Sequence, residues 1–227
     1  KRQLNVEAAK MSLGLGAQRF YQYVRGFGFG ALTRVELAGE VAGDVKSPGD
    51  GRWHDIDLGT NSFGQGIAVT PLQMVAAVAA VANQGKLMRP YIIQEIRRPN
   101  GNVFKTNPEV VRQVIRPETA QVVTRLLGDA ILAESSNKAA VLGYRVVGKT
   151  GTAQISVYGT YDPKWTIASF VGYLPADNPR FVILVKLDKP QTSQWGSQVA
   201  SPVFASVAKQ LVGQIGLPPD AMRMSSK

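Results

Sequence analysis

The C-terminal half of the chain contains three runs rich in apolar and β-branched residues, Arg145–Ile155, Trp165–Leu174 and Arg180–Asp188. Each run predicts a strand, and the segment from Pro175 to Pro179 predicts a tight turn between the last two. Phe181–Leu187 is apolar at almost every position, which is typical of a strand buried on both faces. We therefore expect an α/β chain of the α+β type, with an antiparallel sheet covered by helices on both faces and a mostly helical region.

Helix formers alternate with breaking residues through the rest of the chain. The predicted helices are Leu4 to the glycines at 14 and 16, Ala17–Arg25 after a bend, Pro71 to about Asn83 with Thr70 as N-cap, Glu118 to about Leu132, and Pro202 to about Leu211. The helix after Thr70 carries alanine and valine on every side, which indicates burial. In the fourth helix we expect Val122, Leu126 and Ile131 to form the apolar face, and in the last Val203, Phe204 and Val207.

Between these helices the pattern predicts loops and one hairpin. Thr33 to Gly59 reads as a loop because glycine, proline and charged residues recur through it. Tyr91–Arg97 and Val103–Lys105 predict two short strands joined by the turn Pro99–Asn102. Basic residues gather around this hairpin, and we interpret them as a solvated face.

With 227 residues and 44% hydrophobic composition, the chain can bury a substantial core. Its formal net charge of +10 indicates an anionic partner. Two classes fit: nucleic acid, or the anionic polymers and membrane of a cell envelope. No run of basic residues is longer than Arg97–Arg98, and no interleaved aromatic residues offer base stacking, so we expect no nucleic acid partner. The absence of cysteine excludes disulfides, thiolate metal sites and a cysteine nucleophile.

His54 is the single histidine, and Asp55 and Asp57 follow it. A Ser-His-Asp triad would have to use His54, and a metal site would combine one imidazole with two carboxylates. Since nothing supplies a second imidazole, we interpret His54 as a loop histidine and expect neither a metal nor a cofactor.

The strand that begins at Arg145 carries Lys149, Thr150, Gly151 and Thr152. Its β-branched residues favour an extended backbone, and its glycines remove side chains where another backbone must approach. A peptide could pair with this strand by β-augmentation while the ammonium attracts a carboxylate. We therefore predict that Lys149–Thr152 is a substrate-binding strand.

Four features together resemble the C-terminal part of the transpeptidase domain of a class B penicillin-binding protein. They are Lys-Thr-Gly at 149–151, Ser-x-Gly-Gln-Gly at 62–66 before the Thr70 helix, the Trp195–Ser201 segment, and Asn5 as the asparagine of a Ser-x-Asn motif in which Gln3 replaces the serine. The resemblance implies an incomplete penicillin-binding or serine β-lactamase-like fold. We expect residues 1–227 to be one portion of a transpeptidase domain, with a mostly helical region at 1–144, the sheet and terminal helix at 145–215, and a tail at 216–227.

The resemblance also implies acyl transfer to peptidoglycan. A serine in Ser-x-x-Lys would attack the penultimate carbonyl of a D-Ala-D-Ala stem, and a second stem's amine would resolve the acyl-enzyme. Lys149 and Asn5 would be catalytic, and Lys149, Thr150, Gly151 and Thr152 would bind the substrate. Ser-x-x-Lys occurs at Ser135–Lys138 and Ser206–Lys209, both too late in the chain. We therefore expect the nucleophile outside these residues and the chain alone to be inactive.

Two other functions remain open: a non-catalytic receptor for β-lactams or wall peptides, and a serine β-lactamase. The partners implied by the resemblance are D-Ala-D-Ala stem peptides, acylating β-lactams, a missing N-terminal portion of the domain, and glycosyltransferase, elongation or division proteins. We expect the protein at the extracytoplasmic face of the bacterial membrane, anchored by a segment outside this chain.

Overall fold

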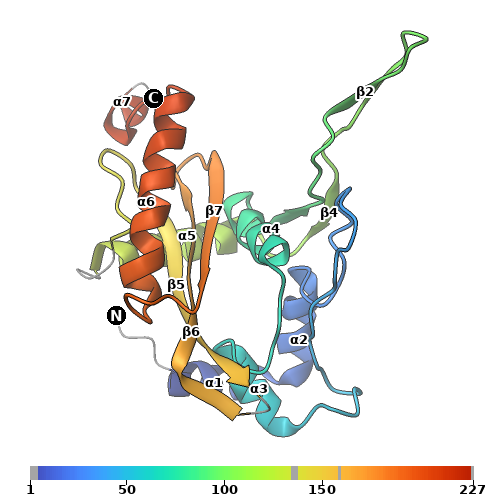
Figure 1. The fold of residues 1–227 in the computed structure, drawn as a ribbon, viewed down its shortest axis with the longest axis vertical. Helices are drawn as coiled ribbons and strands as arrows, with labels where there is room; N and C mark the ends of the chain where they lie inside the picture. The colour runs from blue at the N-terminus through green and yellow to red at the C-terminus, as the bar shows by residue number, and fades with distance from the viewer. Residues whose placement is uncertain (1–4, 134–137, 158–159, 226–227) are drawn as a thin grey trace. The chain divides into compact units, whose positions relative to one another are not determined.

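The computed structural model describes residues 5–133, 138–157 and 160–225. These residues form two compact units, which are described separately (Figure 1). The first unit contains the described residues up to Arg116, and the second contains those from Pro117 onwards. The sequence-based boundaries at residues 144 and 215 stay a prediction.

The first unit contains four helices within its described residues. They are α1 (Asn5–Leu15), α2 (Ala17–Gly26), α3 (Asp55–Ser62) and α4 (Pro71–Ala82). The predicted bend between the first two is confirmed, and Gly16 makes it with a φ of 82°, a left-handed conformation that favours glycine. The predicted start of α4 is also confirmed, because Thr70 Oγ1 accepts from the Gln73 main-chain N–H at 3.1 Å.

The expectation of a loop from Thr33 to Gly59 is wrong at its end, where α3 begins. The carboxylate of Asp57 accepts from the main-chain N–H of His54 at 2.8 Å, which holds the first turn of the helix. Histidine is not among the preferred N-cap residues, so the local sequence carried only a weak signal for this helix start.

Two small antiparallel sheets complete the first unit. β2 (Glu95–Arg97) and β3 (Val103–Lys105) form the predicted hairpin, although β2 is shorter than expected. β1 (Lys86–Met88) pairs with β4 (Val110–Gln113), which the sequence analysis did not predict. Figure 1 shows the hairpin as a long arm that extends beyond β1 and β4.

The second unit is a three-stranded antiparallel sheet with helices packed against it. Its strands run in the order β5 (Val147–Val157), β6 (Thr160–Leu174) and β7 (Phe181–Asp188), and its helices are α5 (Pro117–Ala133), α6 (Gly196–Gln214) and α7 (Asp220–Met224). All three predicted strands are confirmed. α7 lies in the segment that was expected to be a tail.

The two long helices cover opposite faces of this sheet. Side chains alternate along β6, so Phe170 and Tyr173 point to different faces. The Phe170 ring lies 4.6 Å from the ring of Phe204 on α6, whereas the Tyr173 hydroxyl lies 2.6 Å from Thr124 Oγ1 on α5. The predicted sheet with helices on both faces is therefore correct.

Three details of the predicted burial are wrong. β7 is half-buried rather than buried on both faces, and within the described residues it is an edge strand that pairs only with β6. On α5, Val122 and Leu126 are exposed, and Ala120, Gly128 and Ile131 are the buried residues. On α6, Phe204 is buried, but Val203 and Val207 are exposed.

The last helix begins earlier than predicted, at Gly196 instead of Pro202. Pro202 lies inside the helix, so the absence of its N–H did not prevent helix formation in the preceding turn. No helix in the described residues is long and apolar enough to cross a membrane.

Candidate functional site

The predicted substrate-binding strand lies at one edge of the sheet. Only β6 pairs with β5 within the described residues, and Lys149 and Thr152 stand opposite Val171 and Ala168. The other side of β5 therefore offers main-chain groups with which an extended peptide can pair. This is the location that β-augmentation requires.

Gly151 and Gly196 let three main-chain segments come together at the middle of β5. A Cβ on Gly196 would lie 2.3 Å from Ser169 O and 2.5 Å from Gly151 O, and a Cβ on Gly151 would lie 2.5 Å from Ser169 Oγ. These separations are far below van der Waals contact, so only glycine fits without movement. The start of α6 is thus held directly against the substrate-binding strand.

Thr152 connects the strand to α6 by a hydrogen bond. Its Oγ1 accepts from the Gly196 main-chain N–H at 3.2 Å. The hydroxyl keeps its own proton, which it can donate to an incoming oxygen. The N-terminus of α6 adds partial positive charge beside this hydroxyl. This part of β5 therefore favours an anionic ligand such as a carboxylate.

Lys149 is exposed on β5, and its Nζ donates to Thr150 O at 3.0 Å. Strand alternation places the Lys149 side chain on one face and the Thr150 and Thr152 side chains on the other. Because β5 is an edge strand, a ligand lying along its open side can be approached by groups from both faces. The ammonium then supplies the charge and the hydroxyls supply directional hydrogen bonds.

The remaining residues considered in the sequence analysis are not part of β5. Asn5 is the first described residue of α1 and belongs to the first unit, whereas Lys149 belongs to the second. Ser206 and Lys209 are exposed on α6. Ser135 and Gln3 lie outside the described residues. The resemblance alone assigns Asn5 and Lys149 to one site.

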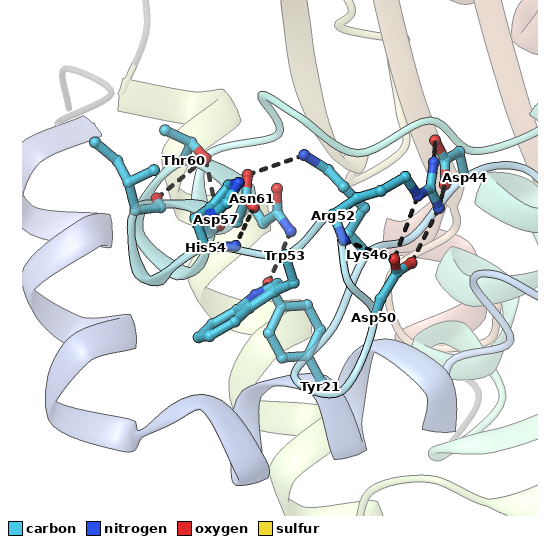
Figure 2. Close-up of polar contacts among 11 residues, drawn as sticks. Tyr21, Asp44, Lys46, Asp50, Arg52, Trp53, His54, Asp57, Thr60 and Asn61 are labelled. Carbon is cyan, nitrogen blue, oxygen red and sulfur yellow. Dashed lines mark hydrogen bonds and ion pairs between the residues drawn. The ribbon is translucent and has the colours of Figure 1, made fainter.

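His54 lies at the start of α3, within a polar network in the first unit (Figure 2). Asp57 accepts from the His54 main-chain N–H and forms an ion pair with Lys46 at 3.2 Å. The His54 hydrogen bond is the main reason why the pKa of the Asp57 carboxyl is lowered. Asp57 therefore stabilises the helix start, which is a structural role. Within the described residues, no group of three His, Cys, Asp or Glu side chains could hold a metal ion.

The first unit also contains a cavity of about 280 Å³. Its walls are mixed: apolar residues such as Phe27, Leu87 and Val111 alternate with charged residues that include Arg34 and Arg89. None of the residues that line it belongs to β5.

The interaction of Gly196 with the strand was missed at the sequence level. Trp195–Ser201 entered the sequence analysis only as one feature of the family resemblance. The structure shows that the contact is made by a main-chain N–H at a helix start. A glycine directly after Trp195 was the available signal, because glycine marks places where backbones approach closely.

Comparisons with known proteins agree with this architecture. The family model described as "Penicillin binding protein transpeptidase domain" matches residues 4–209. Stage V sporulation protein D of Bacillus subtilis is 38% identical over 216 residues, which cover 94% of this chain and 33% of that protein. Peptidoglycan D,D-transpeptidase FtsI of Escherichia coli is 32% identical over 227 residues, which cover 98% of this chain and 36% of that protein.

The fold is also similar to solved structures. Penicillin-binding protein 3 of Mycobacterium tuberculosis, in complex with ampicillin, superposes on this chain with a TM-score of 0.86 and is 32% identical to it. The superposition covers 95% of this chain and 50% of that protein's chain. The chain belongs to the penicillin-binding protein transpeptidase domain family. It spans about a third of the length of the curated relatives that it matches.

Proposed function

We propose that this chain supplies the substrate-binding strand of a peptidoglycan D,D-transpeptidase. The observation that carries the proposal is that Lys149–Thr152 lies on an edge strand, where the Thr152 hydroxyl accepts a hydrogen bond from the N-terminus of α6. Relatives named as D,D-transpeptidases and a related structure holding ampicillin support the same reading.

The ligand is the C-terminal carboxylate of a D-Ala-D-Ala stem, or the carboxylate of a β-lactam. The peptide pairs with the open side of β5, while Lys149 and the hydroxyls of Thr150 and Thr152 hold the carboxylate. The main-chain N–H of Thr152 serves as one donor to the oxyanion. Asn5 is proposed as a further catalytic residue, on the resemblance alone.

The reaction proceeds through an acyl-serine. The serine oxygen forms a bond to the penultimate carbonyl carbon as its proton passes to a lysine base, and the terminal D-alanine leaves with a proton on its amine. The amine of a second stem then forms the cross-link and releases the serine. For a β-lactam, ring opening replaces departure of the leaving group, so the acyl-enzyme persists.

None of the 227 residues is assigned as this serine. Ser206 lies on the exposed surface of α6, where its own N–H belongs to the interior of a helix and cannot complete an oxyanion hole with Thr152. We therefore predict that fluorescent penicillin leaves no covalent label on the 227-residue chain alone. A label mapped to Ser135 or Ser206 would contradict the assignment.

In the native protein, the partners follow from this chemistry. They are stem peptides and β-lactams, together with the enzymes that supply glycan strands during elongation or division. The site faces the extracytoplasmic side of the membrane, where peptidoglycan is assembled.

The decisive experiment measures acylation of the full-length native protein by fluorescent penicillin. Lys149→Ala removes the proposed carboxylate anchor, and we expect the acylation rate to fall by roughly 30- to 1,000-fold, or about 2–4 kcal/mol. Stability should change little, because Lys149 is exposed. Lys209→Ala is the matched control, since it removes another exposed lysine of the same unit.

The time course separates the candidate functions. A stable adduct that depends on Lys149 supports the transpeptidase. Rapid turnover of penicillin would identify a β-lactamase, and no adduct would identify a non-catalytic receptor. Equal acylation rates in the Lys149→Ala and Lys209→Ala proteins would show that the strand has only a structural role.

A further inference from the structure

The β2–β3 hairpin exposes apolar side chains on both of its strands. Ile96 is 52% exposed, Phe104 50% and Val103 47%. A two-stranded hairpin by itself is only marginally stable, and a third strand or a covering element stabilises it. Exposed apolar side chains on such a ribbon indicate an interaction surface.

The two faces of the hairpin differ in chemistry. Ile96 stands opposite Phe104, and the Arg98 guanidinium lies 4.6 Å from the centre of the Phe104 ring. These three residues form one face, which is apolar with a cation over its aromatic ring. The other face carries Lys105 opposite Glu95, and Val103 opposite Arg97.

The outer edge of β3 can accept another strand. Arg98 N donates to Asn102 O, and Thr106 N donates to Gln94 O, both at 2.9 Å. Because inward and outward groups alternate along an antiparallel strand, the main-chain groups of Val103 and Lys105 point away from β2. No third strand pairs with β2 or β3 within the described residues.

We propose that the outer edge of β3 binds an extended acidic segment of a protein partner by strand addition. The main-chain N–H and C=O groups of Val103 and Lys105 pair with the incoming backbone. Carboxylates on one side of the added strand lie near Lys105, while its apolar side chains extend the face formed by Ile96 and Phe104.

Charge favours this occupant over a second copy of the chain. Residues 91–106 contain the bases Arg97, Arg98 and Lys105 and a single acid, Glu95. Two copies paired through β3 would bring like charges together, which is how edge lysines prevent self-association. An acidic strand would instead be attracted by these basic residues, and this attraction would strengthen its binding.

The tip of the hairpin argues against a membrane as the occupant. Its turn, Pro99–Asn102, contains two asparagines, a glycine and a proline. A hairpin that enters a bilayer needs apolar side chains at the part that goes in first, because unpaired polar groups are costly there. The apolar residues here lie along the strands instead, where an added strand would cover them.

The test uses two end-blocked ten-residue peptides, one alternating glutamate with valine and the other lysine with valine. Binding to the isotope-labelled 227-residue chain is followed by the amide resonances of Val103 and Lys105 and by calorimetry. The acidic peptide should bind and shift these amides, and raising the salt concentration should weaken it. The basic peptide should bind at least tenfold more weakly.

Three variants separate strand addition from other modes of binding. Val103→Pro removes an outward N–H without removing a bond of the hairpin, and should weaken the acidic peptide at least tenfold. Val103→Thr keeps that N–H and the β-branched shape, and should stay within about twofold of the parent chain. Lys105→Glu should reverse the preference between the two peptides.

Failure of the acidic peptide to bind at millimolar concentration would overturn the proposal, as would equal affinities of the Val103→Pro and Val103→Thr chains. Vesicles of phosphatidylglycerol that bind the chain and shift the same amides, in the absence of peptide binding, would assign the surface to a membrane and also overturn it. Self-association that depends on Val103 would show that the edge of β3 binds a second copy of the chain, and would also overturn the proposal.

Discussion

Gly196→Ala is the substitution that most directly tests how α6 is held against the substrate-binding strand. Alanine normally stabilises a helix relative to glycine by up to about 1 kcal/mol. At this position, however, the new Cβ would lie 2.3 Å from Ser169 O and 2.5 Å from Gly151 O. Both atoms are main-chain oxygens of paired strands, so neither can rotate away.

The clash has to be relieved by moving the first turn of α6. Overpacking of this kind costs about 1–3 kcal/mol. The movement also breaks the hydrogen bond from the Gly196 N–H to Thr152 Oγ1, which is worth about 1 kcal/mol. After the gain in helix propensity is subtracted, we expect Gly196→Ala to lower the free energy of unfolding by about 1–3 kcal/mol.

Gly213 provides a matched control in the same helix. A Cβ added to Gly213 would have no atom within 4 Å, so Gly213→Ala should leave stability unchanged or raise it by up to about 1 kcal/mol. Urea unfolding of the 227-residue chain, followed by circular dichroism, measures both variants with the same signal. Equal unfolding midpoints for Gly196→Ala and Gly213→Ala would refute the close approach of α6 to β5.

Two further substitutions test buried polar groups. Thr124 Oγ1 donates to Ala120 O and therefore accepts from Tyr173, so Tyr173→Phe should lower the free energy of unfolding by about 1–2 kcal/mol in urea at neutral pH. Burial raises the pKa of Tyr173. The stability that the Tyr173 hydroxyl contributes is therefore present below pH 10 and is lost as pH rises through the higher folded-state pKa. An equal loss of stability at alkaline pH in the Tyr173→Phe chain would contradict this. The pKa of Asp57 is lowered, so its contribution is present above its ordinary value of 3.8 and is lost as pH falls through the lower folded-state pKa. Asp57→Asn should therefore reduce the loss of stability between pH 7 and pH 2.5, and equal losses in both chains would show that another carboxylate is responsible.

The sequence alone was sufficient to predict those helices, bends and strands whose formation depends on residues close together in the chain. Thr70 and Pro71 mark the start of α4, and Gly16 marks the bend between α1 and α2, because caps and left-handed turns depend on adjacent residues. The long β-branched and apolar runs specified β5, β6 and β7 for the same reason. Lys149–Thr152 could also be selected from the sequence, since a cation and two hydroxyls on a strand define a chemistry before any fold is known.

Short strands and helix faces depended on the tertiary structure. β1 has only three residues and pairs with β4 more than twenty positions later, so no local pattern predicts the pair. Val122 and Leu126 formed a plausible apolar face on α5, but the small residues Ala120 and Gly128 face inward instead. Close packing against the sheet selects small side chains over large ones there, and that choice depends on the neighbouring elements.

The candidate site shows the same division. The sequence alone was sufficient to identify the hydroxyl of Thr152, but not the partner that holds it. Its hydrogen-bond donor is the main-chain N–H of Gly196, 44 residues further along, at the start of a helix that the sequence analysis placed at Pro202. Main-chain groups are the same in every residue except proline, so their pairing is invisible in the sequence until folding brings the two segments together.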